Sequence, residues 1–165
     1  MYYLDILTAF YEQKVKYLVV GGLAVNLHGV PRLTSDLDIL IALNKKNVVK
    51  MNRILSDLGY VPRVPVNPND LGDMTIREKW IHEKNMKAFS FYHKKENSRV
   101  IDIVILSPVD YETASKHEMI KKAGPIDLHV ISLNDLILMK EASGRKQDIS
   151  DILLLQRMNE LKGES

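Results

Sequence analysis

Apolar and polar residues recur along the chain in two different periods, which predicts a mixture of strands and helices. Near the N-terminus, Tyr3, Leu7, Phe10 and Tyr11 recur at three- and four-residue spacings, so residues 2–14 are predicted to form an amphipathic helix. A β-favouring run at 17–20 then stops at two glycines, and a helix at 23–28 is predicted to follow. The remaining pattern predicts strands at 37–43, 60–66, 88–92, 100–106 and 126–131, helices at 47–58, 132–144 and 148–161, and loops at 29–35 and 67–75.

The end of the chain is predicted to be a pair of helices. Ser132 followed by Asp135 resembles a capping box, and the helix that it opens would end at Gly144. The second helix would have an apolar side made of Ile149, Ile152, Leu153 and Leu155. The expected fold class is therefore α/β, with a mixed (α+β) sheet over 1–131 and a short C-terminal helical pair over 132–165, in one domain.

Length and composition agree with one cytoplasmic domain. The 165 residues, 45% of them hydrophobic, are enough to bury a single core. The chain has no cysteine, which excludes disulfides, thiol nucleophiles and cysteine metal sites. The longest uncharged apolar stretch, 17–25, is about half of the ~20 residues that a membrane span needs, so we expect no membrane association. A net charge of +2 is too small to indicate nucleic-acid binding by itself.

Two aspartates stand where their carboxylates can converge. Asp36 and Asp38 are two residues apart on a predicted strand, so their side chains would point to the same face, with α-carbons roughly 6.6 Å apart. Two carboxylates at that separation can bind one divalent ion together or bridge two ions ~4 Å apart. Leu40 and Ala42 continue this face in apolar fashion, which places the acidic pair at one end of the sheet.

A third carboxylate, Asp102, is the only charged residue in an apolar run that predicts a central strand. An ionised carboxylate in such a place has to be paired, protonated or bound to a metal. A purely structural interpretation is also open. In it, Asp36 caps its loop, and Asp38 and Asp102 pair with Arg32, Arg99 or a lysine.

A pair of glycines adds to the functional interpretation. Gly21 and Gly22 lead from a strand into a helix, where unpaired backbone N–H groups and the positive helix end suit a phosphate, although an ordinary strand-to-helix turn has the same pattern. The combination of Val20-Gly21-Gly22, Asp36-Leu37-Asp38 and Ile101-Asp102-Ile103 resembles the DNA polymerase β-like nucleotidyltransferase superfamily. Residues 21–38 and 135–152 are also similar to its small prokaryotic branch, which includes abortive-infection (AbiE-type) toxins and aminoglycoside or lincosamide nucleotidyltransferases.

This resemblance implies a Mg²⁺-dependent transfer of a nucleoside monophosphate from an NTP to a hydroxyl acceptor. Asp36 and Asp38 would hold two Mg²⁺ ions, and Asp102 would complete the acceptor-side ion and help to deprotonate the acceptor. Gly21 and Gly22 would let the backbone approach the triphosphate. Contacts to phosphate or acceptor, or else structural ion pairs and caps, are expected of Arg32, Thr34, Lys140 and Arg145.

The acceptor and the partners stay open at this point. An RNA end, a small hydroxyl compound or a protein side chain would each fit, and a second copy of the chain or a partner protein could complete the acceptor site. Two other functions are a catalytically degenerate subunit that acts as a binding or toxin–antitoxin partner, and a metal-dependent nuclease, which the glycine turn and the motif order disfavour. Residues 77–99 carry seven basic and three acidic groups, interleaved with Trp80, Phe89, Phe91 and Tyr92. This stretch would suit single-stranded RNA, or else form a solvated face over the core.

Overall fold

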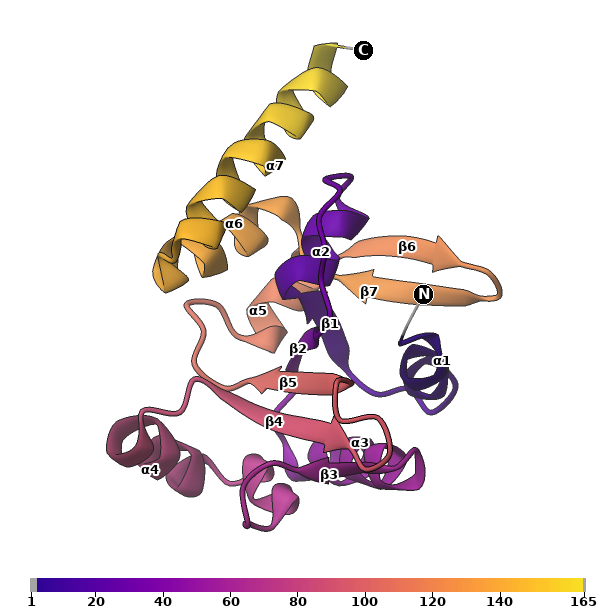
Figure 1. The fold of residues 1–165 in the computed structure, drawn as a ribbon, viewed down its shortest axis with the longest axis vertical. Helices are drawn as coiled ribbons and strands as arrows, with labels where there is room; N and C mark the ends of the chain where they lie inside the picture. The colour runs from indigo at the N-terminus through magenta and orange to yellow at the C-terminus, as the bar shows by residue number, and fades with distance from the viewer. Residues whose placement is uncertain (1–2, 165) are drawn as a thin grey trace.

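A mixed sheet of seven strands organises residues 3–164, the part of the chain that the computed structural model describes (Figure 1). The strands are β1 Tyr17–Val20, β2 Leu37–Ile41, β3 Tyr60–Pro62, β4 Ala88–His93, β5 Val100–Val104, β6 Met119–Ala123 and β7 Ile126–Val130. They lie in the order β3-β4-β5-β2-β1-β7-β6. The pairs β2–β5 and β1–β7 are parallel, and the other neighbours are antiparallel.

Helices surround this sheet and cover its apolar side chains. They are α1 Leu4–Glu12, α2 Gly21–Leu27, α3 Lys45–Asp57, α4 Met74–Lys84, α5 Tyr111–Ala114, α6 Leu133–Ser143 and α7 Lys146–Glu164, with 3₁₀ turns η1 Pro68–Gly72 and η2 Ser115–His117. Helix α2 packs on β1 and β2 and contacts α6. Figure 1 shows α7 beside α6 and running away from the sheet towards the C-terminal end. No helix in residues 3–164 has the length and apolarity that crossing a membrane requires.

The central strands separate an apolar face from a polar one. Phe89 of β4 and Ile101 and Ile103 of β5 are fully buried on one face, and Trp80 of α4 stacks on Phe89 with ring centroids 5.4 Å apart. Side chains alternate between faces along a strand, so Asp102, which lies between Ile101 and Ile103, points to the opposite face. The fold therefore keeps Asp102 away from the apolar face of these strands.

The expected fold class and most of the predicted elements are confirmed, with differences at their ends. The hairpin of β4 and β5 and the capped helix α6, in which the Ser132 side chain accepts a hydrogen bond from the Asp135 N–H, are present as predicted. Strand β2 begins at Leu37, so the expectation that Asp36 lies on the strand is wrong, and Asp36 stands immediately before it. Strand β3 ends at Pro62, shorter than the predicted 60–66, and the two prolines of this run, Pro62 and Pro65, cannot donate ladder hydrogen bonds.

Five elements of the described chain were not predicted, namely η1, α4, α5, η2 and β6. The expected loop at 67–75 contains η1 and the start of α4, where the Asp73 side chain accepts a hydrogen bond from the Ile76 N–H. Most of α4 is exposed and only Trp80 is buried, so its sequence shows no apolar stripe. Strand β6 is an exposed edge strand, which lacks the alternation of a half-buried one.

The predicted apolar side of the last helix is wrong at two of its four residues. Ile149 and Leu153 are 55% and 63% exposed, whereas Asp148 and Asp151 are buried together with Leu155. The helix turns its aspartates inward because their charges are matched there by cations, as the site shows below.

Candidate active site

A row of polar residues crosses the middle of the sheet at one level. Asp38 of β2 lies opposite Val20 of β1 on one side and Asp102 of β5 on the other, and Asp102 lies opposite Ser90 of β4. Because β2 and β5 are parallel neighbours in register, the carboxylates of Asp38 and Asp102 share one face. Gly21 follows Val20 directly, so the glycine turn stands at the end of the same row.

The Asp38 carboxyl has a strongly perturbed pKa. Burial, the negative charge of Asp102, a hydrogen bond between the two carboxyls and the charge of Asp36 together raise the pKa of Asp38 to about 7, while the Arg145 cation opposes the rise. Two close carboxyls favour sharing one proton, because both cannot be ionised there at low cost. This arrangement of buried, mutually repelling acids is typical of functional sites.

The two glycines are required by close contacts. Gly21 has a φ of +64°, and a β-carbon built on it would lie 2.1 Å from Asp38 Oδ2. A β-carbon on Gly22 would lie 2.7 Å from the Thr34 hydroxyl and 3.4 Å from Arg32 Cζ. The start of α2 therefore contacts both the acidic row and the loop before β2, and any larger side chain would separate them.

The acidic residues fit a hard divalent cation in their chemistry. Carboxylate oxygens are ligands that Mg²⁺ prefers, and a cation would relieve the repulsion that raises the pKa of Asp38. Asp36 is half-buried, and its Oδ1 accepts a hydrogen bond from the Ser35 hydroxyl at 3.2 Å. In residues 3–164, no group of three or more histidine, aspartate or glutamate side chains already stands in metal-binding geometry, so Asp36 would have to turn towards Asp38 and Asp102 to join them.

A cluster of ion pairs lies behind this row and joins three segments of the chain. Lys140 of α6 is buried, and its Nζ donates to Asp148 Oδ1 at 3.2 Å and to Asp151 Oδ2 at 2.8 Å. Arg32 binds Asp151 Oδ2 at 2.5 Å, and Arg145 Nε binds Asp148 Oδ2 at 2.8 Å. Burial raises the pKa of Asp148, but hydrogen bonds to Arg145, Ser143 and Lys140 outweigh it and lower this pKa to about 2.

The three cations of this cluster differ in their exposure to solvent and in their distance from the acidic row. The Lys140 ammonium is enclosed by the two aspartates. From the sequence, two roles were open for Lys140, a phosphate or acceptor contact and a structural ion pair, and its contacts match the ion pair. Arg145 keeps 75% of its side chain exposed and interacts electrostatically with Asp38. Arg32 is 24% exposed and lies close to Gly22. Each of the two arginines is therefore held by an aspartate of α7 and keeps part of its side chain exposed to solvent.

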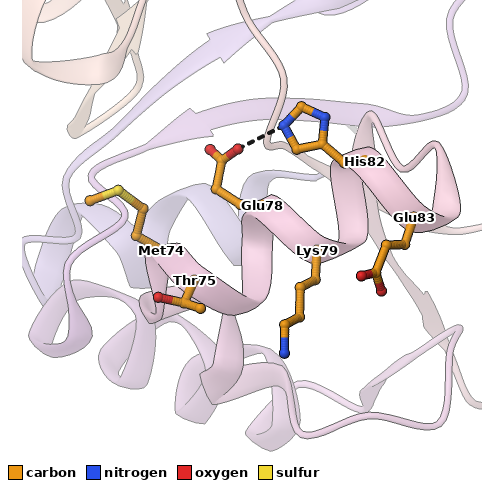
Figure 2. A pocket seen from close by; sticks show the side chains of 6 residues that line it. All are labelled: Met74, Thr75, Glu78, Lys79, His82 and Glu83. Carbon is orange, nitrogen blue, oxygen red and sulfur yellow. Dashed lines mark hydrogen bonds and ion pairs between the residues drawn. The ribbon is translucent and has the colours of Figure 1, made fainter.

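Two hollows lie away from this row. One, shown in Figure 2, is a shallow surface on α4 alone, where His82 Nε2 contacts Glu78 Oε2 at 2.9 Å, and it includes none of the expected site residues. The other, of about 360 Å³, opens at the C-terminal ends of β2 and β5 and includes Leu40 and Val104. These two residues follow Asp38 and Asp102 by two positions, so the second hollow lies further along the same strands, and neither aspartate lines it.

The basic stretch at 77–99 does not form an aromatic platform. Trp80, Phe89 and Phe91 are buried and cannot stack on RNA bases. Arg77 donates to the backbone oxygens of Leu43 and Leu71, and Arg99 pairs with Asp5. The stretch therefore matches the other alternative, a solvated face over the core.

Three residues of the site were missed by sequence reasoning. Ser90 donates its hydroxyl hydrogen to Asp102 Oδ1 at 2.5 Å, and Asp148 and Asp151 anchor the two arginines. A signal for Ser90 was available, because the alternation of Phe89 and Phe91 places it on the face opposite the core. The aspartates gave no such signal, since buried acids do not follow an apolar pattern.

Comparisons with known proteins agree on the fold. LnuA, a lincosamide antibiotic adenylyltransferase with lincomycin bound, superposes with a TM-score of 0.60 at 19% identity, over 94% of this chain and 94% of that chain. ANT(2")-Ia in complex with adenylyl-2"-tobramycin gives 0.57 at 13% identity, over 98% and 92%. An antigenic nucleotidyltransferase-like protein from Paracoccidioides brasiliensis gives 0.52 at 15% identity, over 92% and 73%. Among curated proteins, no sequence matches this chain. A family model described as "Nucleotidyltransferase of unknown function (DUF6036)" matches residues 5–162.

Proposed function

The chain belongs to the nucleotidyltransferase family DUF6036, and we propose that it transfers a nucleoside monophosphate from an NTP to a hydroxyl group of a small molecule, with Mg²⁺. The observation that carries the proposal is the pair Asp38 and Asp102, in register on parallel strands, with Asp38 in contact with the glycine turn. Half-buried acids beside a glycine turn that opens a helix suit a cation and a phosphate together.

Different residues around Asp38 and Asp102 would bind the phosphates of the NTP and the Mg²⁺ ions. The backbone at Gly21 and Gly22 lets phosphate oxygens approach closely, since no β-carbon stands in the way. Arg145 and Arg32 each have guanidinium N–H groups to spare and would bind phosphate oxygens, because a guanidinium presents five donors. Asp36, Asp38 and Asp102 would hold the Mg²⁺ ions, which supply charge neutralisation and an acidified acceptor hydroxyl when bound.

The transfer itself is a displacement at the α-phosphorus. The acceptor oxygen forms a bond to this phosphorus, the bond from it to the oxygen bridging to the β-phosphorus breaks, and pyrophosphate leaves. Asp102 takes the hydroxyl proton and passes it to solvent. The neighbouring Asp38 carboxyl, whose pKa burial and the charge of Asp102 raise to about 7, is suited to hold and release a proton near neutral pH.

A small acceptor is favoured over RNA by the shape of this face. The hollow of about 360 Å³ beyond Asp38 and Asp102 has the size of a small-molecule site and includes Tyr111, Asp110 and Glu112. Its carboxylates would attract an acceptor with amino groups. LnuA, which shares the fold, is described as a lincosamide antibiotic adenylyltransferase, and ANT(2")-Ia, which also shares it, was solved in complex with adenylyl-2"-tobramycin.

Transfer of label tests the proposal. The purified protein is incubated with Mg²⁺, each α-³²P-labelled NTP, and a panel of small hydroxyl compounds, tRNA and protein. We expect transfer to a small molecule, and we expect Asp38→Asn and Asp102→Asn each to abolish it while Asp57→Asn, an exposed carboxylate, leaves it unchanged. Absence of transfer from every NTP, or full activity of Asp38→Asn, would overturn the proposal.

A further inference from the structure

Ser90 has no role in the reaction proposed above, although its side chain contacts one of the acidic residues. It lies on β4 between β3 and β5, where its backbone oxygen accepts the Arg63 N–H at 2.9 Å and its backbone is paired with that of Asp102. Its hydroxyl donates to Asp102 Oδ1 at 2.5 Å. The donor is therefore held by strands on both sides, and its acceptor is one oxygen of a carboxylate in the acidic row.

We propose that Ser90 is a positioning residue that fixes the orientation of the Asp102 carboxylate for nucleotidyl transfer. The inference rests on the proposed function of the same site. An aspartate side chain can occupy several staggered χ1 positions, and its carboxylate rotates broadly about χ2. The hydrogen bond from Ser90 holds Oδ1, so Oδ2 remains available to Asp38, to a cation or to the proton of an acceptor.

The surroundings of Ser90 agree with this role. Its neighbours on the strand, Phe89 and Phe91, point into the core on the other face. The contact of the half-buried serine side chain across the strands is with Asp102. A hydrogen bond to an ionised acceptor is one of the stronger kinds, and the strand backbone does not need to move to form it.

Three serine variants separate positioning from a general structural role. Ser90→Ala removes the donor, Ser90→Thr keeps it, and Ser98→Ala is the matched control in the exposed turn between β4 and β5. We expect Ser90→Ala to lower kcat about ten- to a hundredfold, as loss of a hydrogen bond to a charged group implies, with the KM for the NTP within about twofold of wild type. Ser90→Thr should restore kcat to within about threefold, and Ser98→Ala should match wild type. A kcat for Ser90→Ala equal to that of the control, or a threonine variant as slow as the alanine one, would refute the role.

A measurement without turnover distinguishes failure of this inference from failure of the proposed function. Mn²⁺ binding in the presence of a non-reactive NTP analogue is followed by electron paramagnetic resonance. Ser90→Ala should weaken Mn²⁺ binding about tenfold in the wild-type background and have no further effect in the Asp102→Asn background, because the two residues would act as one unit. Additive effects would overturn the positioning role. A wild-type protein that binds Mn²⁺ in this way but transfers no label would overturn the proposed function and leave the coupling of Ser90 to Asp102 in place.

Discussion

Replacing Gly21 with alanine would place a methyl group against the Asp38 carboxylate. The added β-carbon would lie 2.1 Å from Asp38 Oδ2 and 2.8 Å from Asp38 Cβ, well inside van der Waals contact. Gly124, in the turn between β6 and β7, provides a matched control. Its φ of +61° is close to the +64° of Gly21, but a β-carbon there would meet nothing within 4 Å.

The magnitude follows from the difference between the two sites. An alanine in the left-handed region costs about 1–2 kcal/mol at either position, so this cost cancels between the two variants. Overpacking adds about 1–3 kcal/mol at Gly21 alone. For a protein of this size, that difference lowers Tm by roughly 2–12 °C relative to Gly124→Ala. Asp38 has to move away from the new methyl group, so nucleotidyl transfer should fall as well.

Thermal unfolding of both variants, followed by circular dichroism, measures the difference in stability, and the labelled-NTP assay measures the effect on transfer. Gly124→Ala should keep full activity. If Gly21→Ala unfolded within a degree of Gly124→Ala and transferred label at the wild-type rate, the contact between the glycine turn and Asp38 would not exist in solution.

Two further predictions concern the charged groups. Lys140→Met leaves two buried aspartates without their shared cation and should lower the free energy of unfolding by about 3–5 kcal/mol in urea titrations. The control Lys146→Met, at an exposed position, should change this free energy by less than about 0.5 kcal/mol. Equal effects of the two variants would contradict the ion-pair cluster. The pKa of Asp38, raised to about 7, means that the folded state keeps a proton that the unfolded chain loses above about pH 4, so stability in EDTA should fall as the pH rises from about 4 to 7. Asp38→Asn should flatten this slope and Asp57→Asn should not, and a slope unchanged in Asp38→Asn would assign the titration to another group.

Much of the fold was predictable because it is encoded in short patterns. The hairpin of β4 and β5 follows from two β-favouring runs around a polar turn, and α6 follows from Ser132 and Gly144, which cap its ends. Helix α4 was missed because a helix that buries little beyond Trp80 has no apolar period to detect. Strand β6 was missed for the same reason, since it lies at the edge of the sheet with most of its side chains exposed.

The residues of the candidate site that belong to a sequence motif were predictable. The residues that join it through contacts between distant elements were not. Asp38 and Asp102 were identified from their motifs, and their register on neighbouring strands came only from the structure. The burial of Asp148 and Asp151 depends on their ion pairs with Lys140 of another helix. The pattern of apolar residues along the sequence does not indicate which charges are paired in the fold. For that reason Ile149 and Leu153, which are exposed, were wrongly assigned to the apolar side of α7.

The strand before the glycine turn is completed by a segment from near the far end of the chain. Strand β1 has β2 on one edge, which is synthesised soon after it, and β7 on the other, with Val19 paired to Val130. At roughly 5–20 residues per second, a ribosome needs roughly 5–20 s to make the roughly 110 residues between these two valines. During that time β1 exposes one open edge of an apolar strand, which is the kind of surface on which wrong strand pairing begins. The protein therefore depends, at every round of its synthesis, on this edge being protected until β7 emerges.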